Sequence, residues 1–310
     1  MLRQALLIIL MAAVTIFMFY LLSRLVDIKK LFDTLLSISP AFFILIMLLE
    51  AAIVLLMAKR YQVILGHMGS HVPYHRCLSV NMAAYPLVSV TPSISGNFIK
   101  VLYLRGESPP SMVASSVIAE RLFDLAVLAV LVLFGLALSF NLEFFIIALL
   151  VIAMLVLFMI IARRISGKFK KSILRKLNDV IQVIAGLFRD IRSAFNISMY
   201  SLAIWAIALA QIYLFFIAVD ARIPFLSVLA NMPIAMMIGQ IPVTIGGMGT
   251  RDGVMVELFK GVMSNEQILA AGFMFSVFRY WVPAFTGLFF MIHENRAVFN
   301  KKGKQVNLGQ

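Results

Sequence analysis

The sequence has little of what a disulfide-stabilised protein, a metalloenzyme or a soluble domain needs. Cys77 is the single cysteine, so an intramolecular disulfide framework is excluded. Neither Cys77 nor any of the four histidines stands in a metal-ligand spacing, and the sequence contains no nucleotide-binding loop or nucleophile constellation. Charged residues make up 13% of the 310 residues, against about 25% in soluble domains. We therefore expect no metal, no cofactor and no enzymatic activity.

Hydrophobic residues, in contrast, make up 62% of the chain. Runs of 18 or more apolar residues with few charges are typical of transmembrane helices, because about 20 residues cross the hydrocarbon core. The first run ends in Ser23-Arg24 without a cleavage site, so we interpret it as a retained span and not as a signal peptide. The fold class expected is an all-α membrane protein with about six transmembrane helices, at 5–22, 40–58, 112–139, 142–162, 196–219 and 266–291.

Two further segments, 78–104 and 225–261, are apolar but interrupted by Pro, Gly, Ser and Asn. Non-helical backbone at membrane depth is tolerated only where it is buried in protein or lines a wet cavity. Paired interrupted segments in two halves of a chain are typical of a transporter's binding site. We therefore expect two re-entrant helical hairpins in an inverted repeat. A shift of 150 residues aligns Asn81-Met82 with Asn231-Met232, Pro92 with Pro242, and Gly96 with Gly246.

Lysine and arginine outnumber aspartate and glutamate by 27 to 14, and their placement predicts the topology. Nine of them lie in the segment 163–195, whose apolar spacing predicts an amphipathic helix on the cytoplasmic membrane surface. With a cytoplasmic N-terminus, nineteen fall inside, Arg60 and Lys100 among them, and five fall outside. This count requires each broken segment to enter and leave on one side. It predicts a multi-pass protein of the plasma (inner) membrane with both termini cytoplasmic, a single integral domain at 1–299 and a basic tail at 300–310.

The basic residues have two interpretations. Near the inner leaflet they attract anionic lipid headgroups, with about 1 kcal/mol for each residue close to the surface. Alternatively, they determine topology and nothing more. Neither interpretation involves nucleic acid, because the basic residues flank spans and do not form an independent domain.

The stretch IPVTIGGMGTRDG, from Ile241 to Gly253, carries the strongest candidate ligand groups. Its glycines permit close approach to backbone amides, and Thr250-Arg251-Asp252 can begin a helix whose positive end favours an anion. Arg251 adds a donor fork suited to phosphate. The stretch TPSISGNFIK, which ends at Lys100, repeats this arrangement. The alternative is a structural hairpin closed by an Arg–Asp salt bridge. The candidate substrate-binding residues are Ser93, Gly96, Asn97, Lys100, Gly246, Gly247, Gly249, Arg251 and Asp252.

Several charged residues lie inside the predicted spans. Such groups cost at least about 2.5–3.5 kcal/mol each in a bilayer, so they usually pair and face the protein interior. The motif ERLFD places Glu120, Arg121 and Asp124 in one span, and Arg279 lies in the last span. We expect Arg279 to pair with Asp124 or Glu120, either as a structural network or along a substrate path. Glu50, alone in the second span, is a weaker candidate.

Three motifs together, PSISGNFIK, ERLFD and PVTIGGMGTRDG, resemble the lysylphosphatidylglycerol synthase transmembrane-region family, a flippase-like membrane module. The resemblance covers about 1–299, and the glycine-rich motif is its most specific part. Asn97 and Lys100 stand where members often have an acid and an arginine, and Asp252 stands where glutamate is common. Some members carry a soluble aminoacyl-transferase domain and others do not. The longest polar stretch here is about 30 residues, so the resemblance implies a stand-alone lipid-translocating module.

Two functions are compatible with these observations. The first is a flippase or scramblase that moves an anionic phospholipid or a polyprenyl-phosphate-linked lipid between leaflets. The second is a non-transporting membrane subunit that presents lipid to a separate glycosyl- or aminoacyl-transferase. Membrane lipids are the expected partners in both cases, and the lipid identity and the oligomeric state are left open.

Overall fold

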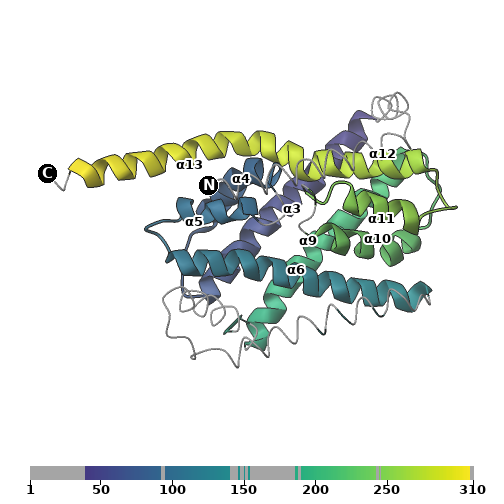
Figure 1. Ribbon diagram of the computed structural model, residues 1–310, viewed down its shortest axis with the longest axis horizontal. Coiled ribbons are helices and arrows are strands. Elements are labelled where there is room, and N and C mark those ends of the chain that lie inside the picture. Colours follow the sequence, from purple (N-terminus) through teal and green to yellow (C-terminus); the bar gives the residue numbers. More distant parts are fainter. Residues whose placement is uncertain are drawn as a thin grey trace.

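The structure is a computed structural model that describes residues 39–91, 95–139, 190–241, 244 and 246–307, with residues 146, 150, 153, 186 and 187. The predicted span 5–22 lies outside these residues, as do most of 142–162 and most of the basic segment 163–195. Within the described part the regular structure is helical (Figure 1). Its elements are α3 (Pro40–His67), α4 (Tyr74–Val88), η1 (Ser95–Ile99), α5 (Lys100–Tyr103), α6 (Pro110–Ser139), α9 (Ile191–Ala218), α10 (Phe225–Gly239), α11 (Thr250–Leu258), α12 (Asn265–Ser276), η2 (Val277–Trp281) and α13 (Val282–Asn307).

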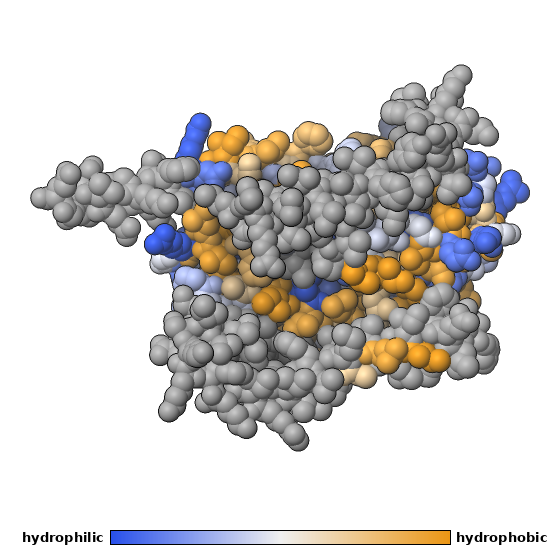
Figure 2. Space-filling view, in the orientation of Figure 1, coloured by the Kyte–Doolittle hydropathy of each residue, from blue (hydrophilic) through white to orange (hydrophobic). Residues whose placement is uncertain are grey.

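Three helices of the described part are long and apolar enough to cross a membrane. They are α3, α9 and the continuous helix formed by α12, η2 and the first part of α13. Helix α6 has 30 residues and carries the three charges of the ERLFD motif in its first half. In Figure 2, apolar residues cover much of the visible described surface, and hydrophilic residues gather toward the two ends of the view. These features agree with an all-α membrane protein.

Local polar residues determine where the long helices begin. The Ser39 hydroxyl accepts a hydrogen bond from the amide of Phe42 at the start of α3. Asp190 accepts hydrogen bonds from Arg192 and Ser193 at the start of α9. The bond from the Ser193 hydroxyl is the main cause that lowers the pKa of the Asp190 carboxyl. These side chains satisfy amides that have no partner within the helix.

The two interrupted segments form two helix–break–helix units with matching details. Helices α4 and α10 each contain 15 residues and a proline, Pro86 or Pro233. The Asn81 side chain donates to the carbonyl four residues earlier in α4, and Asn231 does the same in α10. The observed units begin at Tyr74 and Phe225, so the first begins four residues earlier than predicted.

A close approach of two backbone segments forms the break in each unit. A Cβ at Gly96 would lie 2.5 Å from the amide nitrogen of Val88 at the end of α4. A Cβ at Gly247 would lie 2.5 Å from the carbonyl oxygen of Gly239 at the end of α10, and Gly247 has φ +72. Only glycine permits this approach without displacing backbone. The structural equivalent of Gly96 is therefore Gly247, one residue beyond the predicted Gly246.

Each unit ends in the same kind of turn. Backbone bridges join Arg105 to Ser108 after α5 and Lys260 to Met263 after α11. In Figure 1 the turn after α5 lies on the left side of the molecule, below α13, and the turn after α11 lies at the right end. The two units therefore approach the middle of the molecule from opposite ends.

Each short helix packs on the long helix that follows the other unit. Helix α4 lies against α13, where the Met82 carbonyl contacts Gly287 so closely that a Cβ there would collide with it. Helix α10 lies against α6, where a Cβ at Gly135 would lie 2.5 Å from the carbonyl oxygen of Ala230. Pro86 has no amide hydrogen to bind the Met82 carbonyl, four residues earlier. The two halves of the chain are therefore interlocked through two glycine contacts.

Gly287→Ala and Gly135→Ala should each destabilise the protein by about 1–3 kcal/mol, because the added methyl group must push helices apart. Gly253→Ala is the matched control, since nothing lies within 4 Å of a Cβ at that helical position. The measurement is thermal unfolding of the purified variants in detergent. Unfolding temperatures that are equal for all three variants would contradict the packing described.

Candidate functional site

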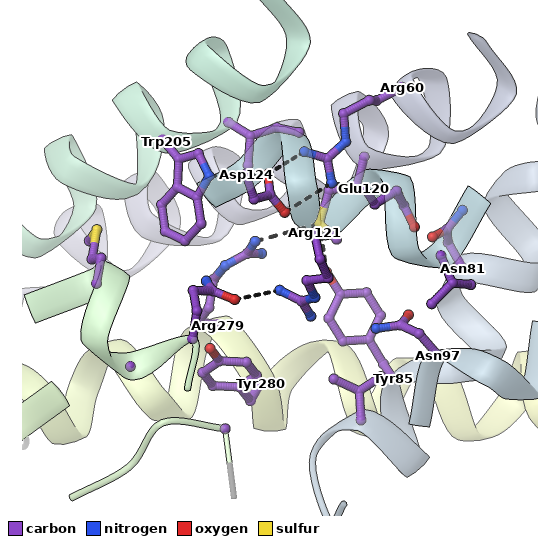
Figure 3. A pocket seen from close by; sticks show the side chains of 18 of the residues that line it. Arg60, Asn81, Tyr85, Asn97, Glu120, Arg121, Asp124, Trp205, Arg279 and Tyr280 are labelled. Atoms are coloured by element: carbon purple, nitrogen blue, oxygen red, sulfur yellow. Dashed lines mark hydrogen bonds and ion pairs between the residues drawn. The ribbon is translucent and has the colours of Figure 1, made fainter. Parts of the chain in front are cut away.

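A cavity lies between the two units (Figure 3). Its walls come from both halves of the chain, and the space open to water-sized molecules is about 70 Å³. This volume corresponds to roughly five water molecules. The residues that line it are Met57, Arg60, Asn81, Tyr85, Val88, Asn97, Val117, Glu120, Arg121, Asp124, Ile204, Trp205, Met236, Gly239, Gln240, Gly246, Arg251, Phe275, Arg279 and Tyr280.

Arg60 is the centre of the ion network on one side of this cavity. Its guanidinium binds both carboxylate oxygens of Asp124, donates to the Ser201 hydroxyl at 2.7 Å and lies 3.5 Å from Glu120. Trp205 donates to the same Asp124 carboxylate at 3.1 Å. The Arg60 side chain is only 1% exposed. Its assignment to the cytoplasmic loop was wrong, because α3 continues to His67 and buries it.

Lys100 joins this network from the first unit. Its ammonium lies 3.0 Å from a Glu120 carboxylate oxygen and 4.2 Å from the centre of the Tyr61 ring. The side chain is 1% exposed. The topology count placed Lys100 on the cytoplasmic side, and its motif made it a candidate substrate-binding cation of the segment 78–104. The structure buries it against Glu120 and the Tyr61 ring, which compensate its charge.

Arg279 lies on another side of the cavity, in the π-helical turn η2. Its guanidinium binds Glu50 of α3 at 3.0 Å, and Gln211 of α9 donates to the same carboxylate at 3.3 Å. The predicted pairing of Arg279 with Asp124 or Glu120 was wrong. Arg60 and Lys100 bind those two acids instead, and the isolated Glu50 is the partner.

Arg251 and Asp252 lie in the first turn of α11, and they pair with each other at 2.6 Å. Arg251 also donates to the Gly272 carbonyl and the Ser276 hydroxyl, both at 2.8 Å. The second Asp252 oxygen accepts from the Gly249 amide at 3.1 Å. This is the Arg–Asp salt bridge that the structural alternative predicted. It anchors the glycine-rich turn to α12.

Arg121 differs from the other four cations around the cavity. Its partner is neutral, since the guanidinium donates to the Gln240 side-chain oxygen at 2.7 Å. Among the described residues no carboxylate lies within ion-pair distance of Arg121. Figure 3 shows Arg121 and Arg279 among the side chains that surround the cavity.

The remaining candidate residues have different positions. Asn97 and Gly246 line the cavity, one from each unit. Gly96, Gly247 and Gly249 are buried in the turns and do not line it. Ser93 lies outside the described residues. Within the described residues, no group of His, Cys, Asp and Glu side chains could hold a metal ion.

A second ion cluster fixes the first unit to α13, apart from the cavity. Arg76 binds Glu294, donates to Glu107 with contacts near 3.0 Å, and donates to the Tyr103 carbonyl at 2.8 Å. The Ser79 hydroxyl donates to the same Glu294 oxygen at 2.6 Å. These residues tie both ends of the unit to one long helix.

Comparison with known proteins agrees with the motifs. The family described as "Lysylphosphatidylglycerol synthase TM region" matches residues 6–287. The chain belongs to this family. Two relatives, both named UPF0104 membrane protein, come from Methanothermobacter thermautotrophicus. One is 22% identical over 273 residues, covering 77% of this chain and 81% of the relative. The other is 23% identical over 330 residues, covering 94% of this chain and 93% of the relative.

Membership of this family makes the protein a membrane module related to lipid handling. The residues matched, 6–287, include every described residue that lines the cavity. The charged cavity therefore lies within the family's transmembrane region.

Among the cavity residues that were not predicted as site residues are Arg60, Trp205, Gln240 and Tyr280. Arg60 directly follows the apolar run of α3, where hydropathy indicates the end of a span. The one available signal was the excess of acids in ERLFD, because two carboxylates on one helix face need more than one cation. The neutral residues carried no comparable signal in the sequence.

Arg279→Leu should lower stability by about 3–5 kcal/mol, because it leaves the buried Glu50 carboxylate without its cation. Arg296→Leu on the same helix is the control, since Arg296 is exposed. The double variant Glu50→Gln/Arg279→Leu should recover part of the loss. Thermal unfolding in detergent measures all three, and a double variant no more stable than Arg279→Leu would contradict the pairing.

Proposed function

We propose that this protein moves the headgroup of an anionic phospholipid or of a polyprenyl-phosphate-linked lipid between the leaflets of the plasma membrane. The cavity is the observation that carries this proposal. It is polar, lies inside a mostly apolar helical protein and has walls from both helix–break–helix units. A charged headgroup cannot cross hydrocarbon unaided, because an unpaired charge there is prohibitively costly.

The proposal includes an arrangement in the membrane. Each helix–break–helix unit is a re-entrant hairpin, and the two enter from opposite faces as an inverted repeat. The matching asparagine bonds, glycine contacts and end turns support this repeat. Both termini are cytoplasmic, as the distribution of lysine and arginine favours.

Different cations have different roles in this mechanism. Arg121, whose partner Gln240 is neutral, faces the cavity and replaces part of the headgroup's water shell. Asn97 and Gly246 contribute polar wall groups from the two hairpins. Lys100 and Arg251 are paired with carboxylates and hold the hairpins in position. Arg279 is paired with Glu50 and holds η2 against α3. The acyl or prenyl tails remain in the bilayer throughout.

Translocation requires the cavity to widen. Space for roughly five water molecules is less than a phospholipid headgroup occupies. The second hairpin meets the cavity wall formed by α6 through the bond between Arg121 of α6 and Gln240 at the end of α10. Separation of the second hairpin from α6 at this contact would admit a headgroup, and the ion pairs behind it would keep each hairpin intact.

The direct test is lipid exchange in liposomes that contain the purified protein and a leaflet-specific fluorescent lipid. Wild-type protein should accelerate exchange of an anionic or polyprenyl-phosphate-linked probe over empty liposomes. Arg251→Ala should slow exchange about tenfold or more, because the glycine-rich turn loses charge-assisted anchors. Arg105→Ala, on an exposed turn, is the control and should exchange at the wild-type rate.

Each variant must be monodisperse by size-exclusion chromatography before its rate is interpreted. A wild-type rate no faster than that of empty liposomes, across several anionic and polyprenyl lipids, would contradict the proposal. That result would favour a subunit that presents lipid to a separate transferase.

A further inference from the structure

The charges around the cavity do not cancel. Among the residues that the structure describes, four carboxylates and five cations lie in its walls and directly behind them. The surplus is therefore one positive charge. The acids are Glu50, Glu120, Asp124 and Asp252, and the cations are Arg60, Lys100, Arg121, Arg251 and Arg279.

The pairings locate this surplus on one residue. Glu50 binds Arg279, and Asp252 binds Arg251. The remaining two acids are shared by Arg60 and Lys100, with Glu120 between them. The partner of Arg121 is the neutral side-chain amide oxygen of Gln240. A guanidinium has five N–H donors, and the bond to Gln240 uses one.

An uncompensated cation inside a membrane protein is costly, and a bound anion removes that cost. We propose that the cavity binds one singly charged phosphodiester headgroup through Arg121, and that it discriminates against doubly charged and zwitterionic headgroups. This inference rests on the proposed function, whose substrate class it narrows.

The chemistry of the two groups fits this assignment. A guanidinium matches a phosphate with two parallel hydrogen bonds. A phosphodiester carries one negative charge, whereas a phosphomonoester carries about 1.5–2 at neutral pH. A second negative charge would find no free cation among the described cavity residues, and an added ammonium group would find no free carboxylate.

Gln240→Glu tests the surplus charge without removing a contact. The new carboxylate would stand where the Gln240 oxygen already accepts from Arg121 at 2.7 Å. If the contact between Arg121 and residue 240 only holds α6 to α10, Gln240→Glu would keep or strengthen it. The positive charge available to a ligand would disappear. Lys260→Gln, on an exposed turn, changes the net charge of the protein by the same amount and is the matched control.

The assay compares four fluorescent lipids in liposomes. Phosphatidylglycerol and a polyprenyl-phosphoryl sugar carry a phosphodiester with one charge, phosphatidic acid is a phosphomonoester, and phosphatidylcholine is zwitterionic. Wild-type protein should exchange phosphatidylglycerol or the polyprenyl-phosphoryl sugar faster than phosphatidic acid and phosphatidylcholine. The phosphodiester lipid that exchanges faster identifies the source of the headgroup. Gln240→Glu and Arg121→Gln should slow that exchange about tenfold or more. Arg121→Lys should retain more exchange than Arg121→Gln, and Lys260→Gln should leave it unchanged.

The outcomes separate this inference from the proposed function. Equal wild-type exchange of all four lipids, or an unchanged phosphodiester rate in Gln240→Glu, would overturn the inference and leave lipid exchange standing. No exchange of any lipid would overturn the proposed function. In that case, native mass spectrometry with phosphatidylglycerol decides the inference. Lipid adducts that are present in the wild type and lost in Gln240→Glu support it, and adducts equal to those of the wild type overturn it.

Discussion

The contact of Arg60 with Asp124 and Glu120 is the interaction on which the arrangement of the described helices depends. It joins α3 to α6, continues through Ser201 to α9, and reaches the first helix–break–helix unit through Lys100. A buried ion pair contributes little net stability compared with apolar packing, but the loss of one partner is severe. The network therefore specifies which helices lie together, while apolar packing and interlocked helices hold them.

The need to bury non-helical backbone explains why the cavity exists. Backbone that leaves the helix must be buried in protein or lie beside water, and both breaks lie toward the middle of the molecule. Each helix–break–helix unit packs on the long helix of the other half through Gly135 or Gly287, so neither half is complete alone. Both units contribute walls to a shared polar space. The surplus charge of Arg121 lies there, where both halves contribute walls.

The interruption of the segments 78–104 and 225–261 could be predicted from the sequence, because clustered proline and glycine inside an apolar run disfavour one continuous helix. The helix start at Thr250-Arg251-Asp252 was also predictable from its local residues. The partners within the ion pairs could not be predicted from the sequence. Whether Arg60 ends a span or enters a core depends on Asp124, which is 64 residues away. Arg279 had two plausible carboxylates on α6, and only the packing of α3 beside η2 selects Glu50 instead.

The central claim is that each interrupted segment enters and leaves on one membrane face, and that the two segments use opposite faces. Single cysteines in a Cys77→Ala background test it at exposed residues: His75 and Arg105 flank the first hairpin, and Arg222 and Lys260 flank the second. The measurement is labelling by a membrane-impermeant maleimide from each side of oriented vesicles. The account predicts that 75 and 105 react from one side and that 222 and 260 react from the other. Labelling of 75 and 105 from opposite sides would contradict it.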